Sequence, residues 1–480
     1  MNIIVAIANY GTKNVEYVKK LIQEYRSMPF NVDIFILSEA PKDYGKQATV
    51  LVGLPTKDPW SLPFGHKRLF AENIDNYDIF IYTEDDTLIR KENILAFLEA
   101  TETLGEQFLP GFIRYELYPN GKKNYPDFHG PYHWISNSVG ECGKYVFASL
   151  SNNHSACYIL TQGQLRKAIA SGGFLVPPHS GRYDLICSAA TDPYTQCGFT
   201  RVICISHLQE FDLHHLPDAY LNHTGMSENN CAVLDEDGQK LQIEALFDIL
   251  YKKKISNELF VTEKTINTSE WDKDYYEPCQ YEILRSIPST ARDILSVGCG
   301  WGATEAHLLE NGKRVVAIPL DSVICRLAEE RGISVLQPDF GLAFEVLGEK
   351  KFDAIILSNV IQHLSNPVEI LTKLGALLSR DGVIVGCVPN LNISQRLCGR
   401  LLAKKNKAQR FKLSSSFVNT NLNLTSISDI KKWLRASKLN PVHVRYENLA
   451  VRPSFSWLIP RLPGGIAASS IVFTAERIFS

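Results

Sequence analysis

The stretch Asp293–Gly302 (DILSVGCGWG) decides the fold of the C-terminal half of this 480-residue chain. Residues 293–297 form a short, mainly apolar run typical of a buried strand, and residues 303–309 are compatible with a helix. The glycines between them permit positive φ and close approach of a ligand, and a helix N-terminus presents free N–H groups. The pattern predicts strand, tight turn and helix; a ligand site and a purely structural turn both remain open on this stretch alone.

The sequence on either side of this stretch repeats the alternation of strand and helix. Apolar, strand-like runs with helical segments between them occur at Arg314–Ile318, Ser334–Gln337, Asp353–Ser358 and Val383–Val388. Such alternation predicts an α/β fold with a doubly wound, Rossmann-like parallel sheet, whose ligand lies beyond the carboxyl ends of the strands. Two later segments, Pro441–Tyr446 and Ser469–Ala475, could supply an antiparallel pair that closes the sheet.

These segments resemble one enzyme family in order and in detail. Asp293–Gly302 looks like the first motif of class I, S-adenosylmethionine-dependent methyltransferases. Residues 352–368 (FDAIILSNVIQHLSNPV) and 377–390 (LLSRDGVIVGCVPN) are similar to the regions that follow that motif in the family. The resemblance covers about 200 residues and implies a Rossmann-like domain with S-adenosylmethionine as cofactor.

A dinucleotide-binding domain is the alternative for the same turn. Gly298, Gly300 and Ala303 also fit the spacing of the dinucleotide fingerprint. The segments 363–367 (HLSNP) and 388–390 (VPN) favour the methyltransferase.

The resemblance implies a set of cofactor-binding residues and shows one departure from the family pattern. Pro319 stands where the family usually has an acidic residue for the ribose hydroxyls, and Asp321 either replaces that residue or caps the helix that follows. Asp339 matches the acidic residue that usually faces the adenine amine. The predicted cofactor contacts are Gly298, Cys299, Gly300, Gly302, Asp321 and Asp339.

The acceptor side of the same domain has one titratable candidate. Methyl transfer requires alignment of the nucleophile, and a hydroxyl acceptor also benefits from a general base. His363 follows the fourth strand, at a position that a base occupies in some sugar methyltransferases; a structural histidine is the alternative. Gln362 replaces the common glutamate. The basic stretch 404–412 lies where such enzymes carry an acceptor-binding insertion, or it is a solvated loop.

In the N-terminal half, three adjacent carboxylates follow a buried strand. Residues 77–83 (YDIFIYT) run directly into Glu84, Asp85 and Asp86. Neighbouring carboxylates repel one another unless a cation or a partner compensates. Hard oxygen ligands suit Mg²⁺ or Mn²⁺ on a diphosphate, whereas an exposed turn that caps the helix at 91–100 is the alternative.

The order of elements around these carboxylates resembles that of GT-A glycosyltransferases. A strand at Asn2–Ala8, a helix at 15–25 and a strand at 32–37 precede the acidic motif, and a strand and the helix 162–171 follow it. The resemblance implies a nucleotide-sugar donor and a glycan or glycolipid acceptor. It gives Ala8, Lys67, Arg68 and Asp85 as donor contacts, with the two cations neutralising the phosphates.

The resemblance also implies a metal and a general base. Glu84, Asp86 and one of the histidines in residues 211–216 (FDLHHL), His214 or His215, are the expected ligands of Mn²⁺ or Mg²⁺; a structural histidine is the alternative. Asp184 and Asp192 are the candidates for the base that deprotonates the acceptor hydroxyl.

Composition and segment boundaries place these halves in one soluble, two-domain protein. Apolar residues make up 45% and charged residues 21%, and a net charge of −2 gives no sign of a nucleic-acid partner. The 11 cysteines lack disulfide or metal spacing, and neither a leader nor a membrane span is evident, so a cytoplasmic location is expected. We expect domains at 1–225 and 273–480, with 226–272 as a linker that carries one helix, at 241–255.

The two resemblances together predict a bifunctional glycan-modifying enzyme. The N-terminal domain would transfer a sugar from a nucleotide-sugar, and the C-terminal domain would methylate a sugar hydroxyl. Tethering of successive steps raises the effective concentration of the shared acceptor. The alternative is one active domain, more readily the glycosyltransferase because of Pro319, with the other as a binding or scaffolding module.

Overall fold

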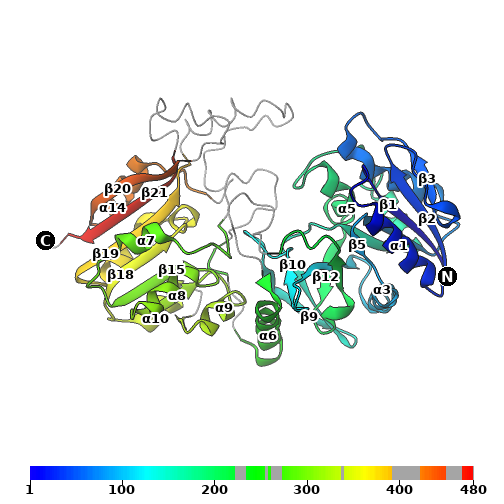
Figure 1. The fold of residues 1–480 in the computed structure, drawn as a ribbon. Coiled ribbons are helices and arrows are strands. Elements are labelled where there is room, and N and C mark those ends of the chain that lie inside the picture. Colours follow the sequence, from blue (N-terminus) through cyan, green and yellow to red (C-terminus); the bar gives the residue numbers. More distant parts are fainter. Residues whose placement is uncertain are drawn as a thin grey trace. The chain divides into compact units, whose positions relative to one another are not determined.

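The computed structural model describes residues 1–221, 234–254, 258–260, 273–336, 340–391, 422–449 and 468–478. It divides the chain into two compact units, Met1–Lys252 and Lys253–Ser480, and each is considered by itself (Figure 1). Both units combine helices and sheets, which confirms the predicted α/β class. No helix in the described ranges is both long and apolar enough to cross a membrane, and every cysteine there is a free thiol.

The main sheet of the N-terminal unit has five strands in the order β11-β4-β1-β2-β3. β1 to β4 are parallel and β11 is antiparallel to β4. Their bounds are β1 Asn2–Ala8, β2 Asn31–Ser38, β3 Thr49–Val52, β4 Ile79–Glu84 and β11 Cys157–Thr161. The order reverses at β1, because β2 and β3 extend from one side of it and β4 from the other. Ligands bind at such a reversal in α/β sheets.

Two smaller sheets complete the N-terminal unit. One has the order β6-β12-β10-β9, with β6 Phe108–Pro110, β9 Trp134–Cys142, β10 Tyr145–Leu150 and β12 Thr200–Cys204. The other has the order β14-β8-β7-β13-β5, with β5 Thr87–Leu88, β7 Ile113–Leu117, β8 Lys123–Tyr125, β13 Asp212–His215 and β14 Leu234–Asp235. β5 is antiparallel to β13, so the chain just after the acidic motif lies beside the two histidines.

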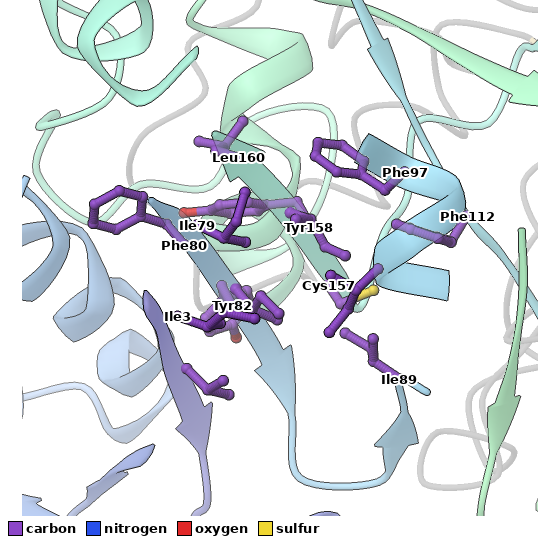
Figure 2. Packing of buried hydrophobic residues seen from close by; sticks show 14 of the residues in the cluster. Ile3, Ile79, Phe80, Tyr82, Ile89, Phe97, Phe112, Cys157, Tyr158 and Leu160 are labelled. Carbon is purple, nitrogen blue, oxygen red and sulfur yellow. The ribbon is translucent and has the colours of Figure 1, made fainter. Parts of the chain in front are cut away.

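The helices of the N-terminal unit follow the apolar periodicity of the sequence. In α1, Val18, Leu21, Ile22 and Tyr25 recur at helical spacing and are all buried. The remaining helices are α2 Gly65–Glu72, α3 Lys91–Thr103, α4 Gln162–Ala170, α5 Leu185–Thr195 and α6 Glu236–Lys252, after α1 Val15–Ser27. Short 3-10 turns are η1 Gly45–Gln47, η2 Pro59–Phe64 and η3 Leu208–Glu210. Figure 2 shows side chains of β1, β4, β11 and α3 gathered in the core of this unit.

The helix expected at 241–255 begins earlier, at Glu236, and ends at Lys252. Asp235 explains the earlier start, because its Oδ1 accepts a hydrogen bond of 2.9 Å from Gly238 N in the first turn. The helix packs on β8, β9 and β14 within the N-terminal unit. An acidic, glycine-containing stretch that suggests a loop in the sequence is thus a capped first turn.

The C-terminal unit is built on one seven-stranded sheet, in the order β17-β16-β15-β18-β19-β21-β20. The first five strands are parallel, and β21 is antiparallel to both β19 and β20, which confirms the predicted doubly wound sheet and its closing pair. Their bounds are β15 Asp293–Cys299, β16 Arg314–Pro319, β17 Ser334–Val335, β18 Phe352–Ser358, β19 Leu378–Pro389, β20 Leu439–Leu449 and β21 Ala468–Arg477. The order reverses at β15.

The helices of this unit alternate with the parallel strands. They are α7 Tyr281–Ser286, α8 Ala303–Glu310, α9 Cys325–Glu330, α10 Phe340–Leu347, α11 Pro367–Ala376 and α14 Ile427–Ala436, with the turn η4 Ile361–His363. The start of α11 is determined by residues adjacent to it in the sequence. Asn366 accepts a hydrogen bond of 3.2 Å from Glu369 N. Pro367 occupies the first helical position, where a backbone N–H would have no partner within the helix, so its missing N–H costs nothing.

Candidate functional site

In the N-terminal unit, the acidic motif lies where the strand order reverses. Ala8 at the end of β1 is the register partner of Glu84 at the end of β4. Asp85 and Asp86 follow directly in the turn to β5. The motif therefore occupies the crevice in which open α/β sheets bind ligands.

Asp85 is held by two amides. Its Oδ2 accepts from Asn9 Nδ2 and its Oδ1 from Asn14 Nδ2, each at 2.7 Å. Burial raises the pKa of Asp85, and these two hydrogen bonds oppose the rise. Lys42 Nζ and Tyr44 Oη donate to Asn9 Oδ1 at 2.7 and 2.9 Å, which fixes the amide so that its N–H faces the carboxylate.

Glu84 experiences a different environment. Burial and the charge of Asp86 raise its pKa to about 8, although Arg114 acts in the opposite direction. Arg114 itself donates to Asp127 Oδ1 from Nη2 at 2.7 Å and from Nε at 3.0 Å. The raised pKa favours the protonated form of the Glu84 carboxyl, which lessens the repulsion within the acidic motif.

Asp86 lies beside one of the two predicted histidines. His215 Nε2 is 3.6 Å from Asp86 Oδ2, and His215 Nδ1 is 2.7 Å from Glu116 Oε1. Burial disfavours the imidazolium, but the hydrogen bonds to Asp86 and Glu116 outweigh it and raise the pKa of His215 to about 9. His214, on the opposite face of β13, stacks on Tyr115 and is 3.1 Å from Asp218 Oδ1.

Of the two aspartates in the acidic motif, only Asp86 has a carboxylate oxygen available for a divalent ion. Both oxygens of Asp85 accept hydrogen bonds from amides, whereas Asp86 Oδ1 is buried and has no hydrogen-bond partner among the described residues. Within those residues, no group of three or more His, Cys, Asp or Glu side chains could hold a metal. Mg²⁺ is often held by one or two carboxylates, with water and substrate phosphates completing its shell, and Asp86 could serve such an ion.

A pocket of about 270 Å³ opens beside the acidic motif. Asn14, Glu84 and Asp85 contribute its polar wall. Its other lining residues are mainly apolar: Ala8, Tyr10, Pro59, Trp60, Leu62, Pro63 and Ile186. Apolar walls with a few convergent polar groups are typical of small-molecule sites.

Four of the other predicted residues have partners of their own. Lys67 forms a buried ion pair with Asp192, whose Oδ1 is also 3.1 Å from His179 Nε2. Arg68 is exposed and pairs with Glu72. The fourth, Asp184, caps α5 and accepts a hydrogen bond of 2.8 Å from Cys187 N.

Asn9, Asn14 and Lys42 take part in the crevice without being predicted from the sequence. Asn9 follows the first strand directly, so its place at a strand's carboxyl end was a usable signal. Asn14 precedes α1 and Lys42 lies in the loop after β2, and neither position carries a local signal.

In the C-terminal unit, the glycines at the end of β15 and in the turn that follows it permit a close approach of the chain to itself. Gly298 and Gly302 have φ of 78° and 83°. A Cβ on Gly300 would lie 2.1 Å from the carbonyl oxygen of Tyr275. The glycine pattern is thus required by packing, whatever ligand the turn binds.

Asp321 adopts the capping geometry. It is fully buried, and its Oδ1 accepts hydrogen bonds from Val323 N at 2.8 Å and Ile324 N at 2.6 Å, ahead of α9. The main chain of Asp321 bridges to Glu258. Asp339 and the basic stretch 404–412 lie outside the described residues.

His363 and Gln362 form part of η4, just after β18. His363 is 5% exposed and stacks on Phe260, with ring centroids 5.1 Å apart. The Gln362 side chain is fully buried, and neither of its polar atoms has a hydrogen-bond partner in the described part of the chain. The loop after β18 thus brings an imidazole and an amide to the carboxyl end of the sheet.

A carboxylate that no local sequence motif distinguishes lies at the carboxyl ends of β15 and β18. Glu277 accepts hydrogen bonds from Ser358 Oγ at 2.8 Å and Asn359 Nδ2 at 3.3 Å. A partly exposed carboxylate and a turn that ends at a helix N-terminus suit a ligand that carries both an ammonium and a carboxylate. S-adenosylmethionine is such a ligand, so the residues present fit the cofactor implied by the resemblance.

Comparison with known proteins assigns this part of the chain. Residues 271–444 match a family model described as "Methyltransferase domain". A solved SAM dependent methyltransferase from Archaeoglobus fulgidus aligns over 41% of this chain and 92% of its own, with 15% identity and a TM-score of 0.31.

The curated relatives that this chain matches are named as O-methyltransferases. The ubiquinone biosynthesis O-methyltransferase of Cereibacter sphaeroides (strain ATCC 17025) is 26% identical over 137 residues, which is 28% of this chain and 51% of that protein. Its counterpart in Xanthomonas axonopodis pv. citri is 26% identical over 197 residues, 36% of this chain and 81% of that protein. The chain spans about half the length of the Cereibacter relatives that it matches. The C-terminal unit therefore contains a class I, S-adenosylmethionine-dependent methyltransferase domain.

Proposed function

We propose that the chain is a bifunctional enzyme that modifies a glycan. Its C-terminal domain methylates a sugar hydroxyl with S-adenosylmethionine, and its N-terminal unit transfers a sugar from a nucleotide-sugar to the glycan or glycolipid acceptor. The observation that carries the methyl-transfer half of the proposal is the seven-stranded sheet with the glycine turn at its reversal, together with the family match over residues 271–444. The relatives' named reaction, an O-methylation, supports a hydroxyl as the methylated group.

In the methyltransferase domain, the side chains after β18 would serve the acceptor. S-adenosylmethionine, when bound, supplies an electrophilic methyl group for an in-line displacement. His363 would accept the proton of the attacking hydroxyl at an imidazole nitrogen. Its stacking on Phe260 fixes the ring and limits access of water to it.

In the N-terminal unit, the proposal is supported by the pocket at the reversal of the sheet. Tyr10 and Trp60 are 56% and 53% exposed at its wall, where a flat nucleobase could stack. Asp85 would accept hydrogen bonds from ribose hydroxyls, and Asp86 would hold a Mg²⁺ or Mn²⁺ ion against the diphosphate. The ion pair between Lys67 and Asp192 supports a structural role for both and leaves Asp184 as the exposed candidate for the base.

A second candidate function follows from the capping role of Asp321. Asp321 uses its Oδ1 to cap the turn before α9, and the residue that ends β16 is Pro319, so the position at which the family usually has a ribose-binding acid has none. The methyltransferase domain would then act as a binding or scaffolding module for an active N-terminal unit.

Two binding experiments on the full chain separate these possibilities. Calorimetry with S-adenosylhomocysteine tests the first half: micromolar binding supports methyl transfer, whereas no binding at millimolar concentration leaves the scaffolding function. A thermal-shift panel of nucleotide-sugars, with and without Mn²⁺, tests the second half. Stabilisation by one nucleotide-sugar supports sugar transfer, and absence of any shift argues against a donor site.

A further inference from the structure

Residues 273–280, here called the strap, lie against the glycine turn of the methyltransferase domain. Trp301 N donates to the carbonyl of Tyr275 at 3.0 Å, and Trp301 Nε1 donates to the carbonyl of Glu277 at 2.7 Å. At the far end of the strap, Gln280 N donates to Thr304 Oγ1 at 3.0 Å. The strap is thus anchored to the turn after β15 and to the start of α8.

The side chain of Glu277 connects this strap to the next strand of the sheet. Its Oε1 accepts from Ser358 Oγ at 2.8 Å and its Oε2 from Asn359 Nδ2 at 3.3 Å, both at the carboxyl end of β18. Asn359 has a φ of 50°, an uncommon conformation for a residue other than glycine. Glu277 therefore links the strap to the carboxyl end of β18, next to β15, where the strand order reverses and a ligand is expected.

The two carboxylate oxygens of Glu277 accept different numbers of hydrogen bonds from the described residues. Oε1 also accepts from Lys273 Nζ at 2.8 Å, so it is bound by an ammonium and a hydroxyl together. Oε2 has one long contact, with Asn359, among the described residues. The Lys273 side chain is fully buried, whereas that of Glu277 is 12% exposed. A carboxylate has about four acceptor sites, so Oε2 retains capacity for another donor.

We propose that Glu277 is a cofactor-binding residue whose Oε2 accepts a hydrogen bond from the α-ammonium of the methionine part of S-adenosylmethionine. This inference rests on the proposed function of the C-terminal domain. The ammonium is the donor of the cofactor that best matches an ionised carboxylate, because charge-assisted hydrogen bonds are the strong ones. Ser358 and Lys273 then act as positioning residues that hold the carboxylate at the reversal of the sheet.

The test compares three ligands on the full chain. S-adenosylmethionine and S-adenosylhomocysteine both carry the α-ammonium, whereas 5′-methylthioadenosine has the same adenosine and sulfur but no amino-acid part. Calorimetry of Glu277→Gln should show Kd raised by about tenfold or more for the first two ligands. For 5′-methylthioadenosine, Kd should stay within about twofold of the unaltered protein. Glu282→Gln, a neighbouring acid paired with Arg285, is the matched control and should change none of the three.

A double variant separates ligand binding from folding. Glu277→Gln leaves the buried Lys273 without its counter-charge, which by itself destabilises the domain. Lys273→Gln combined with Glu277→Gln removes both charges. We expect it to restore part of the melting temperature and to keep the loss of S-adenosylhomocysteine affinity.

The results distinguish failure of the proposed role of Glu277 from failure of the proposed methyltransferase function. Equal weakening of all three ligands, or recovery of S-adenosylhomocysteine affinity in the double variant, would show that Glu277 acts only on the structure and would overturn the inference alone. If the unaltered chain binds none of the three ligands, the proposed methyltransferase function fails and takes this inference with it.

Discussion

Lys67 and Asp192, 125 positions apart in the chain, form an ion pair in the interior of the N-terminal unit. Lys67 is 3% exposed and Asp192 is 0% exposed. The pair joins α2 to α5, and the Lys67 ammonium also lies 4.4 Å from the centre of the Phe64 ring. α2 directly follows η2, and η2 and α5 both contribute walls to the pocket beside the acidic motif, so this pair helps to hold the pocket together.

Replacement of Lys67 by methionine should destabilise the N-terminal unit strongly. The change leaves the Asp192 carboxylate buried without the lysine that pairs with it, although the partly exposed His179 still lies 3.1 Å away, and such a loss costs about 3–5 kcal/mol. Urea unfolding measures the effect. The matched control is Arg68→Met on the exposed face of the same helix, which should leave stability unchanged. Equal effects of the two variants would contradict the buried pair.

Substitution of Gly300 by alanine should abolish cofactor binding. The new Cβ would lie 2.1 Å from the carbonyl oxygen of Tyr275, so the backbone must move. The expected destabilisation is about 1–3 kcal/mol, with loss of S-adenosylhomocysteine binding by calorimetry. Gly140→Ala, where the added Cβ meets nothing within 4 Å, is the control and should preserve binding. Unchanged binding in Gly300→Ala would contradict the described packing of the strap.

Substitutions of Asp321 distinguish a helix-capping role of its carboxylate from a role in binding the cofactor ribose. Asparagine caps helices as well as aspartate does, so Asp321→Asn should preserve both stability and S-adenosylhomocysteine affinity. Asp321→Ala should cost about 0.5–2 kcal/mol of stability because Val323 N and Ile324 N lose their acceptor. A fall in affinity in Asp321→Asn without a fall in melting temperature would instead assign the carboxylate to the cofactor.

The proposed metal site depends on a single carboxylate. Asp86→Asn should remove the thermal shift that Mn²⁺ adds to a stabilising nucleotide-sugar, because Asp86 Oδ1 is the buried oxygen without a partner among the described residues. Asp75→Asn, at an exposed acid paired with Arg166, is the control and should retain the full shift. Retention of the Mn²⁺ effect in Asp86→Asn would assign the acidic motif to a structural role.

His154 should make the N-terminal unit sensitive to acid. Burial and the neighbouring Arg114 lower its pKa to about 3 in the folded state, against about 6.5 in the unfolded chain. The stability that this group contributes is complete above pH 6.5 and is lost as pH falls toward 3, at about 1.4 kcal/mol per pH unit. His154→Gln should therefore flatten the fall of the unfolding free energy between pH 6 and 4 by about that slope. Parallel curves for the two proteins, measured by urea unfolding, would show that His154 takes up no proton on unfolding.

The sequence by itself determined the layout of the methyltransferase domain. Its parallel strands read as separate apolar runs because interior strands are buried on both faces, and the turn at Gly298–Gly302 was visible because the constraint on its backbone is local. The acidic motif was found for the same reason, since three carboxylates stand directly after a buried strand. These features depend on residues adjacent in the chain.

Only the tertiary structure decided the partners of the side chains. From the sequence, Lys67 is a candidate phosphate contact and Asp192 a candidate general base. In the structure the two side chains pair with each other in the interior, away from solvent. The position of His215 rather than His214 beside Asp86 depends on which face of the sheet each of these β13 side chains occupies. Glu277 was not distinguished in the sequence, because its contacts with Ser358 and Asn359 join positions 81 and 82 residues apart. Such contacts arise from packing between distant segments, and the sequence near each residue does not encode them.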